Sequence, residues 1–415
     1  MIKKEVRTLP NGLTLVCVSN DEKHYIGASI YIKYGSAIKD FKVNGKEYHF
    51  KDGIAHLLEH VLIDESVYGN VGKLFFENNV DFNGTTGSRR TKFYINTYEN
   101  FEEHFVKLMN LVNNAVFTPQ SIEHSKGPVF EEIRRKKDDR FFDFNIELTK
   151  SLYKKPELLT GVGEIDDVAS FNFDDLSTIY NAFYKPSNEI VSVYGNFDID
   201  KIVELVEKTY ASFNREYLDV EVDEYKEDKE VNRKYYEITK EEEYPYVEID
   251  YKIPVDEFTP IDKMLIPMVV SDFINCNFSR KSKLYMDMIK DNITKFSVYH
   301  GYHFACDNKY VIINIEVRTD QVDEAVKRVN KVFEEKKPIP YRNFDIAKKK
   351  RQLSYLYSED SPKRFADGYV ENVLYFDYHE FDKYEDLDLL TYEKSQEIMC
   401  KLDFSNYTVM VRKNK

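Results

Sequence analysis

The sequence predicts an α+β protein made of two similar units, each a mostly antiparallel sheet packed with helices. Three observations carry this prediction. The chain has 415 residues, which is long for a single hydrophobic core. Short stretches rich in β-branched and aromatic residues alternate with longer stretches of helical periodicity. The order of strand, helix, paired strands and helix occurs twice, so the two halves have the pattern of diverged copies of one unit.

The first predicted domain covers residues 1–213, and its elements lie between recognisable turn signals. Pro10-Asn11-Gly12 precedes the first strand, and a glycine-containing turn separates two later strands. Strands are expected at 13–18, 27–34, 81–87, 90–97 and 188–195, and helices at 53–63, 71–78, 100–115, 121–138 and 198–212.

Residues 214–240 are rich in Glu, Asp, Lys and Tyr and show little periodicity, so we predict a linker there and a second domain at 241–415. This domain repeats the order of the first. Strands are expected at 246–251, 295–303, 309–317 and 407–411, with helices at 261–275 and 321–336 and a long helical stretch at 342–374.

The composition excludes several classes of protein. A formal charge of −14 and a pI near 5.3 argue against nucleic acid as the main partner. The four cysteines are dispersed without C-x-x-C spacing, which is typical of a reduced, cytoplasmic chain. No secretory signal and no run of 18 apolar residues is present, so we expect no membrane span and a cytoplasmic location.

The strongest functional signal is the pentapeptide His56-Leu57-Leu58-Glu59-His60. Because 3.6 residues complete a helical turn, both histidines and Glu59 lie on one face of the expected helix. That face can bind a metal through two imidazoles and present a carboxylate to a bound water, as in H-x-x-E-H enzymes. With nine His in the chain, chance would produce this string in roughly one chain per hundred.

A catalytic zinc site of this kind needs a third ligand from elsewhere in the chain. The adjacent carboxylates Glu131 and Glu132 lie in an expected helix whose apolar side contains Val129, Phe130 and Ile133. One of the two glutamates should therefore face inward, although a solvated acidic pair would give the same pattern.

The motif, preceded by Asp52-Gly53-Ile54-Ala55, resembles the signature of the pitrilysin (insulinase, M16) family of zinc peptidases. Leu9-Pro10-Asn11-Gly12-Leu13 is similar to the first strand of that family. Asn83-Gly84-Thr85-Thr86, followed by Arg90-Thr91-Lys92-Phe93-Tyr94, is similar to its Asn-Ala-x-Thr segment and next strand. The resemblance covers the first 240 residues well and the remainder only by architecture, and half-size bacterial members that work as dimers are closest in layout.

The resemblance implies a zinc site and a mode of substrate binding. Matching Lys126-Gly127 to relatives assigns the third ligand to Glu132, with His56 and His60 as the other ligands and Glu59 as the general base. It also implies that an extended peptide pairs with the edge formed by Asn83, Gly84, Thr85 and Thr86. Ser125 stands where many members have a second glutamate, so we expect the support of Glu132 to differ while metal binding persists.

A second departure concerns the partner. Family enzymes use an Arg and a Tyr in the second half to hold substrate near the zinc, and Ile289 and Phe296 occupy those positions here. We therefore expect a zinc endopeptidase for short or unfolded peptides, acting in peptide maturation as the catalytic subunit of a heterodimer with a homologue that lacks the zinc motif. The alternatives are a self-sufficient homodimeric oligopeptidase and a non-catalytic structural or binding subunit.

The remaining histidines carry weaker predictions. His104 and His124 lie among charged residues of expected helices, so both are expected at the surface. His300 and His303 flank Gly301-Tyr302, and a secondary metal site there is a minor alternative.

Overall fold

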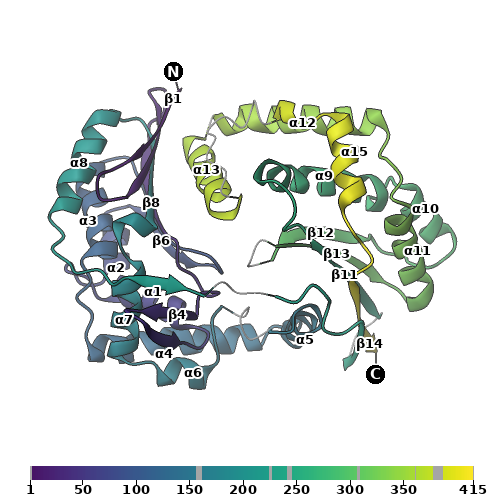
Figure 1. Cartoon of the computed structure of the whole chain (residues 1–415), viewed down its shortest axis with the longest axis horizontal. Helices are drawn as coiled ribbons and strands as arrows, with labels where there is room; N and C mark the ends of the chain where they lie inside the picture. The colour runs from purple at the N-terminus through teal and green to yellow at the C-terminus, as the bar shows by residue number, and fades with distance from the viewer. Residues whose placement is uncertain are drawn as a thin grey trace. The chain divides into compact units, whose positions relative to one another are not determined.

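The computed structural model describes residues 2–155, 161–223, 227–240, 245–305, 309–359, 361–376 and 387–414, which form two compact units (Figure 1). The first unit comprises Met1–Asp139, Glu157–Tyr225 and Tyr357–Leu374, and the second comprises Arg140–Pro156, Lys226–Leu356 and Tyr375–Lys415. Each unit therefore includes a segment from the other half of the sequence. The predicted boundaries at 213 and 241 did not foresee these two segments.

The first unit is built on a six-stranded sheet with the order β1-β2-β8-β3-β7-β6. All neighbouring strands are antiparallel except β2 and β8. The strands are β1 Ile2–Thr8, β2 Thr14–Asn20, β3 Ile26–Ile32, β6 Asp81–Thr86, β7 Thr91–Thr97 and β8 Glu189–Gly195, and a small sheet contains β4 Asp40–Val43, β5 Lys46–His49 and β9 Val220–Val222.

Helices cover both faces of this sheet. One face forms the main core, where Ile30, Phe93 and Val191 meet apolar residues of α1, α3 and α8. On the other face lies α13 (Figure 1), whose Asp367 accepts hydrogen bonds from Tyr31 and Lys92. The helices are α1 Ile54–Asp64, α2 Val71–Glu77, α3 Phe101–Asn113, α4 Pro119–Lys137, α6 Ile165–Ser170, α7 Phe173–Phe183, the short 3₁₀ helix Pro186–Asn188, α8 Ile199–Ala211 and α13 Pro362–Phe376.

The second unit contains a five-stranded sheet with the order β10-β14-β11-β13-β12, in which β10 and β14 are parallel and the other neighbours antiparallel. Residues Val247, Ile313 and Val411 face the helical core, while Ser151 and Phe144 of α5 contact the opposite face at Met410 and Tyr246. The elements are α5 Phe142–Leu152, β10 Tyr235–Lys240, β11 Tyr246–Pro254, α9 Pro260–Phe278, α10 Lys283–Lys290, β12 Tyr299–Phe304, β13 Tyr310–Arg318, α11 Val322–Glu335, α12 Tyr341–Glu359, α15 Tyr392–Lys401 and β14 Tyr407–Asn414.

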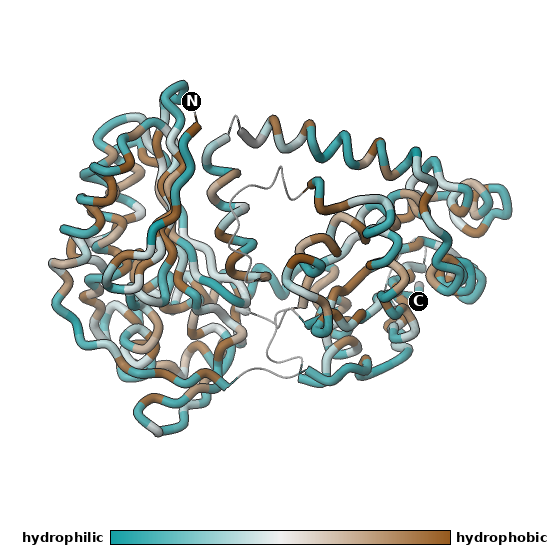
Figure 2. Tube along the Cα trace, turned by 45° about the horizontal axis from the view of Figure 1, so that its top comes forward, coloured by the Kyte–Doolittle hydropathy of each residue, from teal (hydrophilic) through white to brown (hydrophobic). Residues whose placement is uncertain are grey.

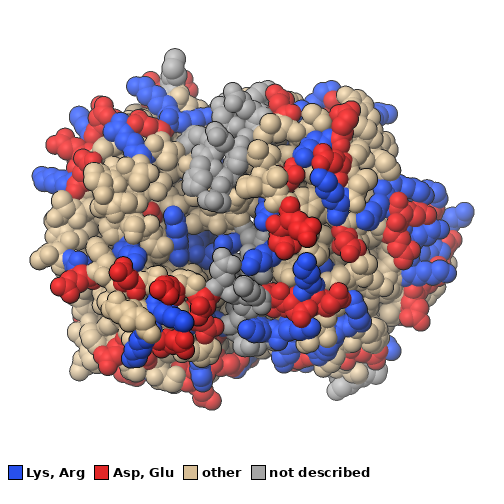
Figure 3. Space-filling view, viewed as in Figure 1, with Lys and Arg blue, Asp and Glu red and all other residues tan. Residues whose placement is uncertain are grey.

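The two sheets share one topology. The order and directions of β2, β8, β3, β7 and β6 match those of β10, β14, β11, β13 and β12. This confirms the predicted α+β fold of two similar, mostly antiparallel units packed with helices. In Figure 2 the hydrophobic stretches run mainly through the interior of each unit, and in Figure 3 acidic and basic side chains are interspersed over the visible face. None of the described helices is long and apolar enough to cross a membrane.

Two stretches differ from the local structure predicted for them. The long helical stretch 342–374 is divided into α12 and α13, because Pro362 has no backbone N–H to continue a helix and instead starts the next one. The predicted linker includes the boundary between the two units, which follows Tyr225, but it also contains the strands β9 and β10, which pair with β4 and β14. The same stretch is also anchored by fully buried Lys252, whose Nζ lies 3.1 Å from Glu227 Oε1 and donates to the carbonyl oxygen of Asp228 at 2.7 Å.

Three carboxylates gather on the face of the second sheet that lies opposite its helical core. Glu248 and Asp250 are two positions apart on β11 and so share a face, and Glu316 on β13 is the cross-strand partner of Glu248. Asp250 is 1% exposed. Burial raises the pKa of Asp250 to about 8, and the charge of Glu316 adds to this effect. Burial also raises the pKa of Glu248 well above its usual value.

We expect the second unit to lose stability as the pH rises. The unfolded chain releases the Asp250 proton near pH 3.8 and the folded chain only near 8, so the stabilisation is complete below the first value and lost above the second. Asp250→Asn should remove this loss, on the order of a few kcal/mol between about pH 5 and about pH 9. Urea unfolding at both pH values measures it, with exposed Asp256→Asn as the control. An unchanged pH dependence in Asp250→Asn would contradict the assignment.

Candidate metal centre

The helix α1 is fixed at its first residue by a close backbone contact. Gly53 is its N-cap with φ +94°, and a Cβ there would lie 2.5 Å from the carbonyl oxygen of Val162. Only glycine allows both this backbone conformation and this approach. Leu58 and Val61 pack into the core of the first unit, so the adjacent face of α1 is held toward α4 and β6.

The structure brings His56 and His60 of α1 together with Glu132 of α4. Their potential ligand atoms all lie within 4.8 Å of one another. Glu132 Oε2 is 3.4 Å from His56 Nε2 and 3.8 Å from His60 Nε2. Ligands of a tetrahedral zinc ion at about 2.0–2.1 Å are separated by about 3.4 Å, so these three side chains fit such an ion with little adjustment. Two imidazoles and a carboxylate also form a donor set that zinc enzymes use.

The structure separates the two adjacent glutamates. Glu132 is part of the metal-binding cluster, whereas Glu131 is exposed and pairs with Arg134. Lys136, one turn further along α4, lies 3.2 Å from Glu132 Oε1. Burial acts to raise the pKa of Glu132, but His56, Lys136 and His60 together hold it below its usual value. Glu132 is therefore held as a carboxylate, the form that binds metal.

Both histidines are held in the neutral form that binds metal. Burial, followed by repulsion from His60, lowers the pKa of His56 to about 4, although Glu132 acts in the opposite direction. Burial also lowers the pKa of His60, with Glu132 and Asp64 opposing the change. His56 Nδ1 is buried and has no hydrogen-bond partner among the described residues. Little proton competition therefore opposes metal binding near neutral pH.

Glu59 lies beside the three predicted ligands and outside their cluster. It is 6% exposed, and the Thr86 hydroxyl donates a hydrogen bond of 2.5 Å to its Oε2. Burial raises the pKa of Glu59 to about 7, the charge of Glu132 adds to the rise, and the Thr86 bond opposes it. A carboxylate with this pKa can accept and return a proton near neutral pH.

Ser125, which stands where many members of the similar family have a second glutamate, helps to support the metal ligands indirectly. Ser125 is fully buried and donates to Asp64 Oδ2 at 2.7 Å, and Asn70 donates to Asp64 Oδ1 at 3.0 Å. Asp64 lies one turn after His60 on α1, and its charge raises the pKa of His60. A carboxylate near His60 is thus supplied by α1, where Ser125 holds it in place. The sequence signal for this role of Asp64 is its position four residues after His60, which places both side chains on one face of the helix.

The predicted peptide-binding residues form β6, which is the edge strand of the described sheet. Gly84 faces α1, since a Cβ on it would lie 2.7 Å from Glu59 Oε1. Thr86 also points to Glu59, whereas Asn83 and Thr85 are exposed. The segment is therefore a strand along its whole length, and its backbone edge runs beside Glu59. The role of Thr86 in holding Glu59 was not foreseen from the sequence.

The other singled-out residues lie elsewhere. Ile289 is half-buried on α10, and Phe296 lines a separate pocket of the second unit. His104 is 4% exposed and packs against Phe75, so its predicted surface position was wrong. His300 and His303 are an odd number of positions apart on β12 and so point to opposite faces.

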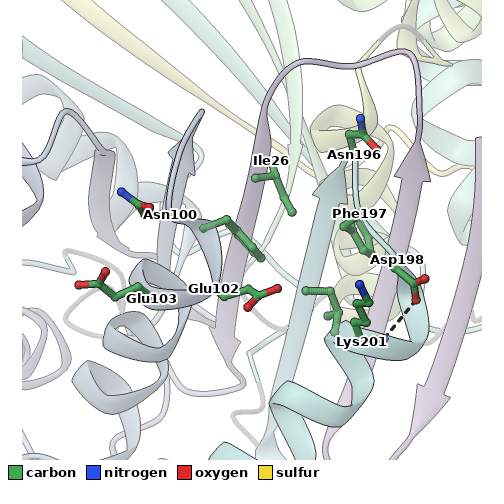
Figure 4. A pocket seen from close by; sticks show the side chains of 10 residues that line it. Ile26, Asn100, Glu102, Glu103, Asn196, Phe197, Asp198 and Lys201 are labelled. Carbon is green, nitrogen blue, oxygen red and sulfur yellow. Dashed lines mark hydrogen bonds between the residues drawn. The ribbon is translucent and has the colours of Figure 1, made fainter.

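Another pocket of the first unit is distinct from this centre (Figure 4). It has a volume of about 510 Å³ and lies at the N-termini of α3 and α8, where Asn100, Glu102, Asp198 and Lys201 line it. None of the predicted metal ligands is among its lining residues.

Comparison with known proteins gives consistent results. A family model described as the peptidase M16 inactive domain matches residues 170–353. His56, Glu59, His60 and Glu132 all precede this range, so the match concerns the part of the chain without them. The uncharacterized zinc protease YmfH of Bacillus subtilis (strain 168) is 24% identical over 405 residues, which is 94% of this chain and 92% of that protein. Zinc protease PqqE of Helicobacter pylori is 28% identical over 228 residues, 51% of this chain and 47% of that protein.

Solved structures show the same architecture. An M16-like peptidase from Alicyclobacillus acidocaldarius superposes with a TM-score of 0.86 at 20% identity, covering 100% of this chain and 99% of that one. A protease from Helicobacter pylori gives a TM-score of 0.78 at 18% identity over 99% of both chains. Together with the H-x-x-E-H helix, these similarities show that the chain resembles M16 peptidases in sequence and shares the two-unit α+β fold of M16-like structures.

Proposed function

We propose that this chain is a zinc-dependent endopeptidase that cleaves short or unfolded peptides, with His56, His60 and Glu132 as ligands. The observation that carries the proposal is the arrangement around Glu59. This buried carboxylate lies outside the three-residue cluster and is next to the free edge of β6. The zinc proteases among the relatives support the same chemistry.

In the proposed mechanism, Glu59 moves the proton. A bound zinc ion would supply the Lewis acid that lowers the pKa of a water molecule and polarises the scissile carbonyl. Thr86 holds Glu59 Oε2, which leaves Oε1 to accept the proton of the attacking water and then to give it to the leaving amine. Burial of Glu59 keeps its pKa near 7, so both transfers are accessible near neutral pH.

The edge strand β6 suggests how the peptide is held. An extended peptide can add to an unpaired strand edge through backbone hydrogen bonds, and such binding tolerates many side chains. Gly84 has no side chain between this edge and Glu59, and the space a Cβ would need is already filled by the Glu59 carboxylate. We propose that the scissile bond of this extended peptide lies over Gly84. A folded protein could not present an extended segment along β6 in this way.

We further propose that the active form is a heterodimer with a homologous subunit that lacks the zinc motif, and that it acts in peptide maturation in the cytoplasm. Ile289 and Phe296 support the heterodimer, since neither can donate a hydrogen bond from its side chain. Cys17, Cys276 and Cys400 are free thiols, which is consistent with a reducing compartment.

Zinc content and peptide cleavage, measured on the same preparation, test the proposal. The purified chain is assayed with an unstructured fluorogenic peptide, alone and mixed with its nearest homologue lacking H-x-x-E-H. We expect one zinc per chain and cleavage only in the mixture, with a chelator abolishing the cleavage.

Each other outcome removes a defined part of the proposal. Full cleavage by the chain alone would contradict the shared-site heterodimer and leave a self-sufficient zinc peptidase. Zinc binding without cleavage in either sample would favour a non-catalytic subunit. Cleavage that survives complete removal of zinc would exclude the metal mechanism.

A further inference from the structure

The second unit contains a pocket lined by cationic and aromatic side chains. Its volume is about 380 Å³, within the range of small-ligand sites. The pocket is formed where α10 and the ends of β12 and β13 meet. Its lining includes Arg280, Lys295, Arg318, Tyr285, Tyr299 and Phe296.

The three cations of this pocket have no carboxylate partner in the part of the chain that the structure describes. Among the described residues, no carboxylate lies within ion-pair distance of Arg280, Lys295 or Arg318. Two other cations of this region do have carboxylate partners, Lys283 with Asp287 and Arg328 with Asp291. In a chain with a net charge of −14, three unpaired cations around one pocket are a local exception to the overall charge.

The guanidinium groups are positioned by neutral contacts that leave donors available. Arg280 Nε donates to Ser297 Oγ at 2.8 Å, and the Arg318 guanidinium lies 5.7 Å from the centroid of the Phe296 ring. Such groups bind carboxylates with two parallel hydrogen bonds. The hydroxyls of Tyr285 and Tyr299 add two further donors to the lining.

The aromatic part of the lining distinguishes a peptide from an inorganic anion. Phe296 and the two tyrosine rings offer apolar surface that phosphate or a similar ion would leave unused. A C-terminal residue uses both parts, since its carboxylate meets the cations and its side chain meets the rings. Glu316, the cross-strand neighbour of Tyr299, bonds instead to Tyr246 and is not part of the lining.

We propose that this pocket binds the C-terminal residue of a peptide, with Arg280, Lys295 and Arg318 holding the carboxylate and Phe296 its side chain. The identification of the ligand as a peptide rests on the proposed peptidase function. The pocket then gives the second unit a role in selecting substrates by their free C-terminus. Phe296, which stands where the resemblance implies a Tyr, then contacts the side chain of the peptide's last residue directly.

Two peptides of the same sequence without acidic side chains, one with a free C-terminal carboxylate and one with a C-terminal amide, test the inference. Their affinities are measured by calorimetry against the full chain carrying Glu59→Gln, so that neither is cleaved. We expect the free acid to bind at least about tenfold more tightly, equivalent to about 1.4 kcal/mol. Adding Arg280→Gln and Lys295→Gln should remove this difference. Both residues are exposed, so the fold should be unaffected.

The matched control carries Lys281→Gln and Lys290→Gln. Both lysines are exposed, lie close in sequence to the test positions and do not line the pocket. This pair removes the same charge and should keep the tenfold difference. Equal affinities of the two peptides, no binding of either, or an equal loss in the control would overturn the inference. Inorganic phosphate competing equally with both peptides would assign the pocket to a free anion and overturn it as well. Because no cleavage is measured, the result is independent of the proposed catalysis.

Discussion

The Glu59→Gln chain is expected to keep one zinc ion and to lose peptide cleavage by about 10²- to 10⁴-fold. The amide has nearly the shape of the carboxylate and can still accept the Thr86 hydrogen bond, but it cannot take a proton from water. His56, His60 and Glu132 are unchanged, so the metal should stay. Zinc content and kcat on the same preparation, assayed under the conditions that give cleavage in the unsubstituted chain, measure the two effects separately.

A control for this substitution is available at the end of the same helix. Glu65→Gln makes the same chemical change at the C-cap of α1, away from the cluster, and should leave both zinc and kcat unchanged. Loss of zinc in Glu59→Gln would show that Glu59 is a ligand and that the assignment of roles is wrong. Retained cleavage with retained zinc would exclude Glu59 as the general base.

The second large effect is expected at Glu132. Glu132→Ala removes the carboxylate that lies 3.4 Å from His56 Nε2 and leaves the two imidazoles as the only protein ligands among the three. Zinc affinity should therefore fall by more than the roughly 100-fold typical of losing a residue that only hydrogen-bonds a metal ligand. Cleavage should be lost with the metal. Zinc affinity is measured by competition with a chelating indicator.

The neighbouring glutamate provides the control for this second prediction. Glu131→Ala makes the same change one residue earlier, where the side chain is exposed and pairs with Arg134, and should leave zinc affinity near that of the unsubstituted chain. The reverse order of effects would move the third ligand to Glu131. Similar losses in both variants would point to damage to α4 and not to a ligand.

The predictions from sequence were most accurate where structure is local. The helix at 53–63 is observed as α1, because the periodicity of its apolar residues and the glycine before it act within a few turns. The strands of the two sheets were largely found from their composition, and the repeated order of elements corresponds to a shared topology. The prediction of one continuous helical stretch failed at 342–374. Pro362 is a local signal for a new helix, but the helical periodicity on both sides of it favoured a single stretch.

The predictions missed features that depend on segments distant in sequence. Nothing in α5 or α13 indicates that α5 packs on the second sheet and α13 on the first. The hydroxyl of Thr86 reaches Glu59 only because β6 lies against α1, and Ser125 reaches Asp64 only because α4 does. The cationic pocket likewise combines Arg280, Lys295 and Arg318 from three separate stretches of chain.

The sequence is sufficient to place His56, Glu59 and His60 on one helical face, because helical periodicity follows from backbone hydrogen bonding within a few residues. The residue pattern alone left Glu131 and Glu132 as alternative third ligands of the metal, and the family resemblance favoured Glu132. Which carboxylate lies among the imidazoles depends on the folded chain, because it is set by how α4 is rotated as its apolar residues pack into the core. The raised pKa of Glu59 was decided in the same way, because burial is a property of the folded chain.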